Sequence, residues 1–291
     1  MELGNDFKDF LSSIQPDDDE VAAAKAAHEQ VRDELRTDSE SKDAHEDTFL
    51  SGSYARRTAI NDINDVDVIC ILDIDRNITP PEVLLSWVEG IVSKYYKEVR
   101  PQGRSIGAEG KGGVWLDIVP ATPVSAADGP LWIPDREVKQ WVQTHPKGQI
   151  AACNERNKTT NGYFVQVVKL LKAWRDRLPT KSCQLKSYIL ESLIHKTIGT
   201  SPSSHAGAIV NVLEGIESSY GAYRGTNIVP AITDPGNPSV IVTKHLPAKE
   251  FDDFMIQVKS GAQVARSAFD NNDESSSRKL WRQLFGSQFG Q

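Results

Sequence analysis

The stretch DVDVICIL, residues 65–72, constrains the fold of this chain more than any other. Its β-branched and apolar residues are typical of a central strand in a sheet. The strand nevertheless opens with two carboxylates, Asp65 and Asp67, which are costly to place beside an apolar run unless something neutralises them. Residues two apart point to the same side of a strand, about 6.6 Å apart. The two carboxylates can therefore bind one hard divalent cation such as Mg²⁺.

Other aspartates near this strand are not equivalent. Asp73 and Asp75 have the same spacing but lie about 20 Å further along an extended chain, so we expect them to be solvated. Asp117 is instead the only charge in the apolar run VWLDIV. If that run is a strand beside the first, Asp117 completes a cluster of three carboxylates that can hold two cations. The alternative is that the three carboxylates are incidental.

A Gly-Ser pair precedes the aspartates, with Ser53 twelve positions before Asp65. Glycine lets the backbone approach a ligand closely, so Gly52 suits a phosphate site. A serine at a helix start adds a hydroxyl to exposed N–H groups, which also suits a phosphate. The following RRT segment, residues 56–58, could add contacts, although exposed arginines near a helix start are often only solvated.

Composition excludes several classes of protein. The net charge of −7 argues against general nucleic-acid binding, although a small anion needs only a local positive pocket. Cys70, Cys153 and Cys183 are too far apart for a disulfide framework or a zinc site. No run approaches the roughly 20 apolar residues that span a bilayer, and the acidic N-terminus is unlike a secretory signal. We therefore expect a cytoplasmic protein without a membrane segment.

Hydrophobic periodicity predicts an α+β fold in two lobes. Residues 1–135 are expected to form an N-terminal helix and an α/β core with a mixed sheet, and residues 136–291 a mainly helical lobe, with an active-site cleft between them. The expected helices cover residues 16–40, 80–99, 162–178, 185–199, 247–269 and 273–286. Two short strands are expected within residues 103–121, and one within 239–246 of a long connection.

The order GS, about ten residues, DxD and a further Asp resembles the nucleotidyltransferase superfamily of the DNA polymerase β kind. The helices VVKLLKAWRDRL and LKSYILESL look like a pair in cyclic GMP–AMP synthase, oligoadenylate synthase and the bacterial CD-NTases. That resemblance implies that Lys172 and Ser187 contact the donor triphosphate and that Tyr188 stacks on the donor base. Lys172 lies at the edge of an apolar stripe, so we expect it to face a cleft rather than the core. The alternatives are a solvated lysine and an ordinary core tyrosine.

The resemblance implies a reaction as well. Two Mg²⁺ ions, which Mn²⁺ can replace, would be held by Asp65, Asp67 and Asp117. A hydroxyl of one nucleotide would attack the α-phosphate of ATP or another NTP, releasing pyrophosphate, with Asp117 placed to accept the hydroxyl proton. Repetition and ring closure would give a cyclic di- or trinucleotide second messenger for anti-phage defence.

Partners and rival functions follow from the same comparison. The resemblance implies regulatory or conjugating partner proteins from a defence operon. The tail Phe289-Gly290-Gln291 could be joined to such a protein, although a frayed terminus is simpler. The sequence shows no long basic surface of the kind that would indicate activation by nucleic acid. The rival functions are transfer to another acceptor (a protein, an RNA 3′ end or a small molecule) and nucleotide binding without catalysis.

Overall fold

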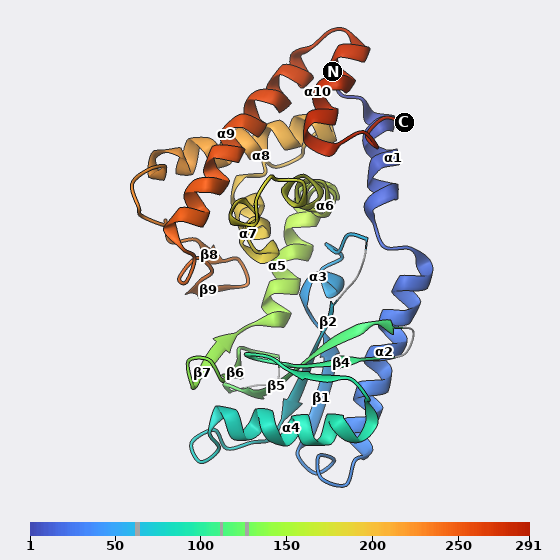
Figure 1. Ribbon diagram of the computed structural model, residues 1–291, viewed down its shortest axis with the longest axis vertical. Coiled ribbons are helices and arrows are strands. Elements are labelled where there is room, and N and C mark those ends of the chain that lie inside the picture. Colours follow the sequence, from blue (N-terminus) through green and yellow to red (C-terminus); the bar gives the residue numbers. More distant parts are fainter. Residues whose placement is uncertain (62–64, 111–112, 126–127) are drawn as a thin grey trace. The chain divides into compact units, whose positions relative to one another are not determined.

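The structure is a computed structural model that describes residues 1–61, 65–110, 113–125 and 128–291 (Figure 1). Its internal contacts divide the chain into two compact units. One unit is Pro16–Ala151, and the other combines Met1–Gln15 with Ala152–Gln291. This division differs from the sequence-based boundary at residue 135, because a strand hairpin spans that boundary and the first residues pack with the C-terminal helices. The predicted cleft stays a prediction.

The first unit is built on a mixed sheet, as predicted. Within the described residues the sheet has seven strands, in the order β1-β2-β5-β4-β3, with β6 pairing with β5 and β7 with β6. The strands are β1 (His45–Leu50), β2 (Asp65–Leu72), β3 (Val99–Pro101), β4 (Ile106–Glu109), β5 (Trp115–Pro123), β6 (Leu131–Asp135) and β7 (Gln140–Thr144). The helices are α2 (Asp18–Thr37), α3 (Gly52–Ala55) and α4 (Pro81–Tyr95). Strands β2 and β5 are parallel, and the other pairs are antiparallel.

The two faces of β2 and β5 are covered differently. Alternate residues of a strand point to opposite faces, and the even-numbered set of β2, which includes Val66 and Val68, packs against α2 and α4 in one apolar cluster. The odd-numbered Ile69 and Ile71 belong to a smaller cluster with β6. Figure 1 shows α2 and α4 beside the sheet. Asp67 shares the odd-numbered side, where fewer elements cover the sheet.

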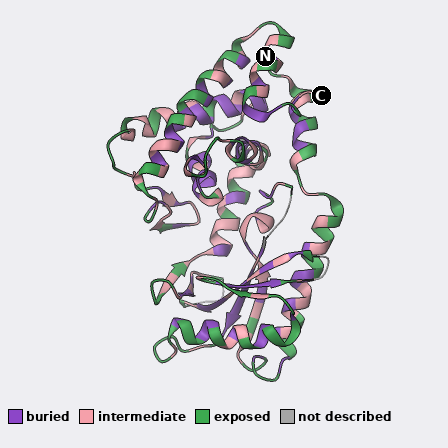
Figure 2. Cartoon of the chain, in the orientation of Figure 1, coloured by how far each residue is buried: buried purple, intermediate pink, exposed green. Residues whose placement is uncertain are grey.

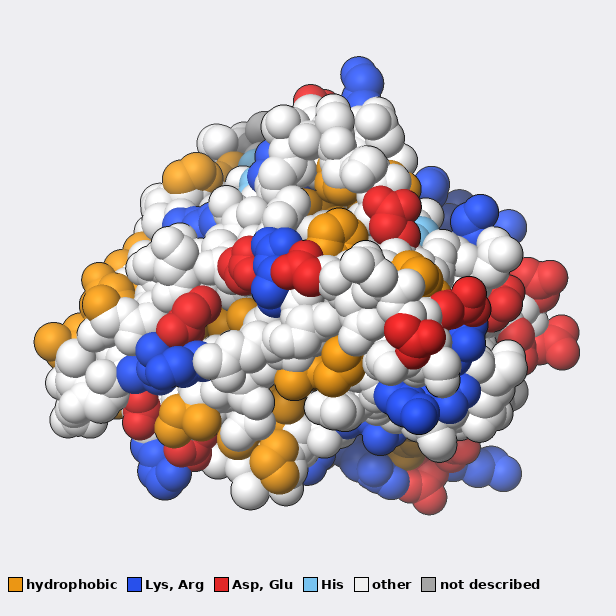
Figure 3. Space-filling view, turned by 90° about the horizontal axis from the view of Figure 1, so that it is seen from above, with side chains coloured by type: hydrophobic (Ala, Val, Ile, Leu, Met, Phe, Trp, Pro, Cys, Tyr) orange, Lys and Arg blue, Asp and Glu red, His pale blue; other side chains and the backbone are white. Residues whose placement is uncertain are grey.

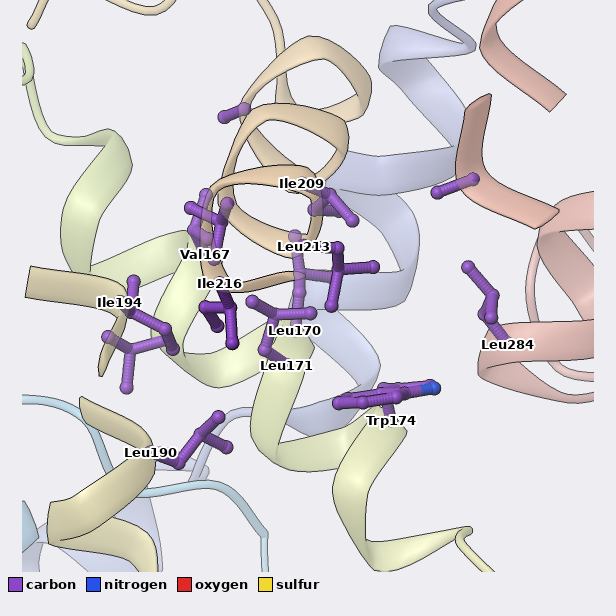
Figure 4. Packing of buried hydrophobic residues seen from close by; sticks show 14 of the residues in the cluster. Val167, Leu170, Leu171, Trp174, Leu190, Ile194, Ile209, Leu213, Ile216 and Leu284 are labelled. Atoms are coloured by element: carbon purple, nitrogen blue, oxygen red, sulfur yellow. The ribbon is translucent and has the colours of Figure 1, made fainter. Parts of the chain in front are cut away.

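The second unit is helical apart from one small hairpin. Its elements are α1 (Gly4–Ile14), most of α5 (Pro146–Thr159), α6 (Tyr163–Asp176), η2 (Lys181–Cys183), α7 (Ser187–Thr197), α8 (His205–Tyr220), η3 (Gly221–Tyr223), β8 (Thr233–Asp234), β9 (Asn237–Ile241), α9 (Ala248–Asp270) and α10 (Glu274–Phe285). Its large apolar core includes Val167, Leu171 and Trp174 of α6 and Leu213 of α8 (Figure 4). Buried residues accordingly concentrate along the inner sides of these helices (Figure 2).

The C-terminal tail is not frayed, which corrects the simpler reading of the sequence. Phe289 has no exposed surface and packs edge-on against Phe7 of α1, with ring centroids 4.8 Å apart. Arg282 donates hydrogen bonds to the carbonyls of Phe289 and Gly290, each at 2.8 Å. The aromatic contact explains why α1 belongs to the helical unit although it comes first in the sequence.

Most predicted elements are confirmed, with two kinds of exception. The central strand, the helix after the acidic PDDDE segment and the last two helices lie where expected. The start of that first long helix is fixed by a capping box between Asp17 and Glu20. The prediction of mainly helical structure from residue 135 was wrong for β7 and did not include α5 or α8, and the sequence analysis also missed α1 and β1. In the described part of the chain, no helix combines the length and apolarity needed to cross a membrane.

Candidate active site

Asp67 and Asp117 occupy matching positions on neighbouring parallel strands. Asp67 of β2 is paired in register with Asp117 of β5. Partners in register point to the same face of a sheet, and both residues are half-buried rather than sealed in the core. The sequence predicted this arrangement on condition that the two strands are neighbours, and that condition is confirmed. Asp73 and Asp75 are exposed beyond the end of β2, as expected.

The Gly-Ser turn lies directly against the Asp67 carboxylate. The backbone N–H of Ser51 donates to the carbonyl of Asp67 at 2.8 Å, which fixes α3 beside β2. Gly52 has a φ of +63°, and a Cβ atom built on it would lie 1.7 Å from Oδ2 of Asp67. Only glycine fits both the left-handed backbone and the space. Ser53 is half-buried on α3, whereas Arg56 and Thr58 are buried rather than solvated.

Asp117 is oriented by a residue that the sequence reading missed. Gln102, in the loop before β4, donates from Nε2 to Oδ1 of Asp117 at 2.8 Å. Its own Oε1 accepts from the Ser105 hydroxyl at 3.0 Å. Gly107 faces Asp117 across the sheet, and a Cβ there would come within 2.9 Å of the Gln102 amide. Gly107 therefore leaves the space through which Gln102 reaches Asp117. No sequence motif predicts this contact between Gln102 and Asp117.

The carboxylates described by the structure fit a divalent cation only in part. The backbone of Asp65 is paired with Trp115 at the start of β2, but its side chain lies outside what the structure describes. Within the described residues, no group of three or more His, Cys, Asp or Glu side chains could hold a metal ion. Asp67 and Asp117 nonetheless supply two hard oxygen donors on one face, the ligand type that Mg²⁺ prefers. A third donor from Asp65 stays a prediction from the sequence.

Lys172 is buried on α6 instead of lying at the edge of an apolar face. Its side chain is 3% exposed, and its Nζ lies 2.7 Å from Oε1 of Glu191 on α7, which is 4% exposed. A buried lysine is stable as a cation only when it is paired. The tertiary structure thus replaces the predicted position facing a cleft with an ion pair between two helices. A role in binding triphosphate stays a prediction.

Arg175, near the end of α6, is a second basic residue that the sequence reading overlooked, and it contacts the start of α7. Arg175 donates from Nη1 to the Ser187 hydroxyl at 2.8 Å and to the Leu185 carbonyl at 3.1 Å. Burial, together with the charge of nearby Lys172, lowers the pKa of the half-buried Lys169. These three basic residues follow each other at intervals of three on α6, so they lie on adjoining sides of one helix. That spacing could have been read from the sequence.

Tyr188 is neither a core residue nor a detached surface residue. It is half-buried, and it is not among the described side chains that pack against the large apolar core. Its hydroxyl donates to Oδ1 of Asp234 at 2.5 Å. Asp234 belongs to the TDPGNP segment and is 3% exposed. The tyrosine ring is therefore held at its far end while part of its surface stays accessible.

The surface charge gives no sign of a basic track where it can be seen. On the face in Figure 3, Lys and Arg side chains alternate with Asp and Glu side chains. Such mixed charge does not favour the dense phosphate contacts of general nucleic-acid binding.

These features describe a nucleotidyltransferase: a mixed sheet with paired carboxylates and a Gly-Ser turn, together with a helical unit that carries three basic residues at intervals of three on α6. The chain matches the Second Messenger Oligonucleotide or Dinucleotide Synthetase domain family over residues 1–157, more than half of its length. The chain belongs to this family, the CD-NTases, and it is a cyclic oligonucleotide synthase.

Curated relatives agree with this assignment, and solved structures agree with the fold. The chain is 33% identical to a cyclic AMP-AMP-AMP synthase of Acinetobacter sp., over 99% of this chain and 86% of the relative. It is 28% identical to a cyclic AMP-AMP-GMP synthase of Enterobacter hormaechei, over 99% and 92%. The fold is similar to that of Escherichia coli MS115-1 CdnC solved with ATP, with a TM-score of 0.81, 19% identity and full coverage of both chains. CdnC has also been solved in complex with a HORMA protein, where the TM-score is 0.83 at 18% identity, covering 100% of this chain and 99% of CdnC.

Substituting Gly52→Ala is expected to lower the rate of cyclic nucleotide synthesis by about 100-fold. The added methyl group would displace the Asp67 carboxylate, and a misplacement of a reacting group by about 1 Å lowers the rate by about 100-fold. Gly90→Ala on α4 is a matched control, since its added Cβ meets no atom within 4 Å. The measurement is product formation from NTPs by both variants, with thermal melting to check folding. A folded Gly52→Ala variant within threefold of wild type would contradict the close approach seen here.

Proposed function

We propose that this enzyme joins ATP into a cyclic trinucleotide, with AMP units as its main or only building blocks. The single observation that carries the proposal is the register of Asp67 and Asp117 on β2 and β5, with Gly52 against Asp67. The choice of adenine is supported by the 33% identity to a cyclic AMP-AMP-AMP synthase, which extends along 99% of this chain. The proposed role of this signal is in anti-phage defence.

The proposed mechanism assigns one task to each site residue. Asp65, Asp67 and Asp117 would hold Mg²⁺, which supplies charge neutralisation for the reacting phosphoryl oxygens when bound. Asp117, oriented by Gln102, accepts the proton of the attacking hydroxyl. The backbone N–H groups around Gly52 and the Ser53 hydroxyl bind phosphate oxygens.

The helical unit is proposed to hold the donor nucleotide. Lys172 and Ser187 contact its triphosphate, and Tyr188 stacks on its base. The ion pair of Lys172 with Glu191 supports the proposed contact between Lys172 and the triphosphate. A cation that is already desolvated and fixed in position needs little reorganisation when it binds a phosphate. Arg175 keeps the Ser187 hydroxyl in place through its hydrogen bond.

A direct test is incubation of the purified protein with ATP, GTP, CTP and UTP, singly and mixed, in the presence of Mg²⁺. The expected product from ATP alone resists phosphatase and has the mass of three AMP units joined in a ring. Removing the divalent cation with a chelator should abolish the product, and Mn²⁺ should restore it. A linear or protein-linked product would contradict the proposal and would favour one of the rival acceptors.

We also propose that a regulatory protein controls this activity. The support is that CdnC, which has the same fold, was solved in complex with a HORMA protein. Synthesis that rises at least tenfold when a protein encoded beside this one is added would agree with such control. Full activity of the isolated enzyme, unchanged by that protein, would contradict it.

A further inference from the structure

The small β8–β9 hairpin is tied to the tyrosine that is proposed to stack on the donor base. Asp234 at its turn accepts the Tyr188 hydroxyl at 2.5 Å and the Gly236 N–H at 2.7 Å, both on Oδ1. Asp234 is 3% exposed, so the carboxylate end of these part-buried bonds is shielded from water, which strengthens its hold on the phenol. The hairpin and the tyrosine ring therefore form one local unit, although they lie 46 positions apart in the chain.

Asn237 sits across the hairpin from Asp234. The two residues are partners in register, so their side chains leave the same face of the two strands. Asn237 is 8% exposed, and its Oδ1 accepts from the Ser239 hydroxyl at 2.7 Å. Its Nδ2 is buried without a hydrogen-bond partner among the described residues. If the amide were turned by 180°, its oxygen would be left in that place. Either orientation leaves one buried polar atom of this amide for a ligand to satisfy.

The chemistry of an amide at this place favours adenine. Nδ2 supplies a donor, and Oδ1 keeps a second lone pair beside its bond to Ser239. On the N7 edge, which is the edge that this proposal has Asn237 contact, adenine offers the complement, an N6 amino donor next to the N7 acceptor, whereas guanine offers two acceptors there, O6 and N7. The O6 and N1–H of guanine would match an amide on the opposite edge, so the selection depends on contact at the N7 edge. A guanine oxygen would face the amide oxygen and leave the carbonyl lone pair unmatched.

We propose that Asn237 reads the base of the donor nucleotide and selects adenine over guanine, while Asp234 orients Tyr188 for stacking. This inference rests on the proposed function, in which Tyr188 contacts the donor base. It makes Asn237 a specificity-determining residue of the cyclic nucleotide synthase and Asp234 a positioning residue.

The test measures binding rather than synthesis. Non-hydrolysable analogues of ATP and GTP are titrated by calorimetry into wild type, Asn237→Ala and Asn237→Ser, with Asn154→Ala on the exposed side of α5 as a matched control. Wild type and the control should bind the ATP analogue at least tenfold more tightly than the GTP analogue. Either Asn237 variant should reduce that ratio at least fivefold, since one matched pair of base contacts discriminates by about that factor or more.

A third variant separates selection from positioning. Tyr188→Phe keeps the ring and loses the bond to Asp234, so it should weaken both analogues by a similar factor and leave their ratio within twofold of wild type. An unchanged ratio in a folded Asn237→Ala or Asn237→Ser variant would overturn the inference, as would a wild type that does not distinguish the analogues. If the wild type bound neither analogue and made no product, the proposed function itself would fail.

Discussion

Replacing Asp67 by asparagine is expected to lower the rate of cyclic nucleotide synthesis by about 10³-fold or more. Asparagine keeps the size of the side chain, but it removes one of the anionic oxygen donors on which metal-assisted charge stabilisation depends, an effect worth several kcal/mol. Because Asp67 is half-buried and the substitution is nearly isosteric, the melting temperature should stay close to that of wild type. The measurement is turnover with saturating ATP and Mg²⁺, quantified as phosphatase-resistant product.

Asp73→Asn provides the matched control for this experiment. Asp73 follows the same strand and is exposed, and its backbone N–H donates to the Ala44 carbonyl. Its substitution removes the same charge close to β2 without touching the paired carboxylates, so turnover should change less than twofold. If Asp67→Asn were as active as Asp73→Asn, the assignment of the register pair as the reacting centre would be wrong.

Replacing Glu191 by glutamine is expected to destabilise the protein by about 3–5 kcal/mol in urea-unfolding measurements. Lys172 is 3% exposed and its ammonium lies 2.7 Å from the Glu191 carboxylate. Removing the carboxylate leaves a cation buried without its counter-charge, which is the case in which breaking an ion pair costs most. Glu217→Gln is a suitable control, because its pair with Arg224 is about one quarter exposed on each side and should contribute about 1 kcal/mol or less.

A double variant tests whether the Lys172–Glu191 pair only stabilises the fold or also contributes to nucleotide binding. Lys172→Met with Glu191→Leu removes both charges, so most of the lost stability should return. If Lys172 also binds the donor triphosphate, the stable double variant should still lose about tenfold or more in affinity for a non-hydrolysable ATP analogue. A double variant that is stable and binds the analogue as wild type does would show that the pair is structural only.

The reacting strand was predictable because its information is local. Alternation along DVDVICIL places Asp65 and Asp67 on one parity, and the lone charge in VWLDIV marks a second strand with a role beyond packing. The register that joins Asp67 to Asp117 required only that the two strands be neighbours, and they are. The hairpin β6–β7 was missed because LWIPD and QWVQT are too short to carry a clear period.

The supporting contacts were not predictable, since each joins residues far apart in the chain. Gln102 reaches Asp117 only because Gly107 leaves space between them. Tyr188 is held by Asp234, which lies 46 positions further along the chain, so no local pattern pairs the two residues. Helical periodicity placed Lys172 at the edge of an apolar stripe, but periodicity describes one helix and not the neighbour that covers it.

The sequence by itself determined the chemistry of this protein, namely the carboxylates, the Gly-Ser turn and the strand and helices that carry them. It could do so because spacing along one strand or one helix already sets which side chains share a face. The tertiary structure alone decided which of those side chains are exposed and what orients them. Glu191 pairs with Lys172, which was expected to face a cleft, in a buried ion pair, and the β8–β9 hairpin brings Asp234 to Tyr188. The reason is physical, since burial and hydrogen bonding depend on the neighbours that packing brings together, and no local pattern specifies these.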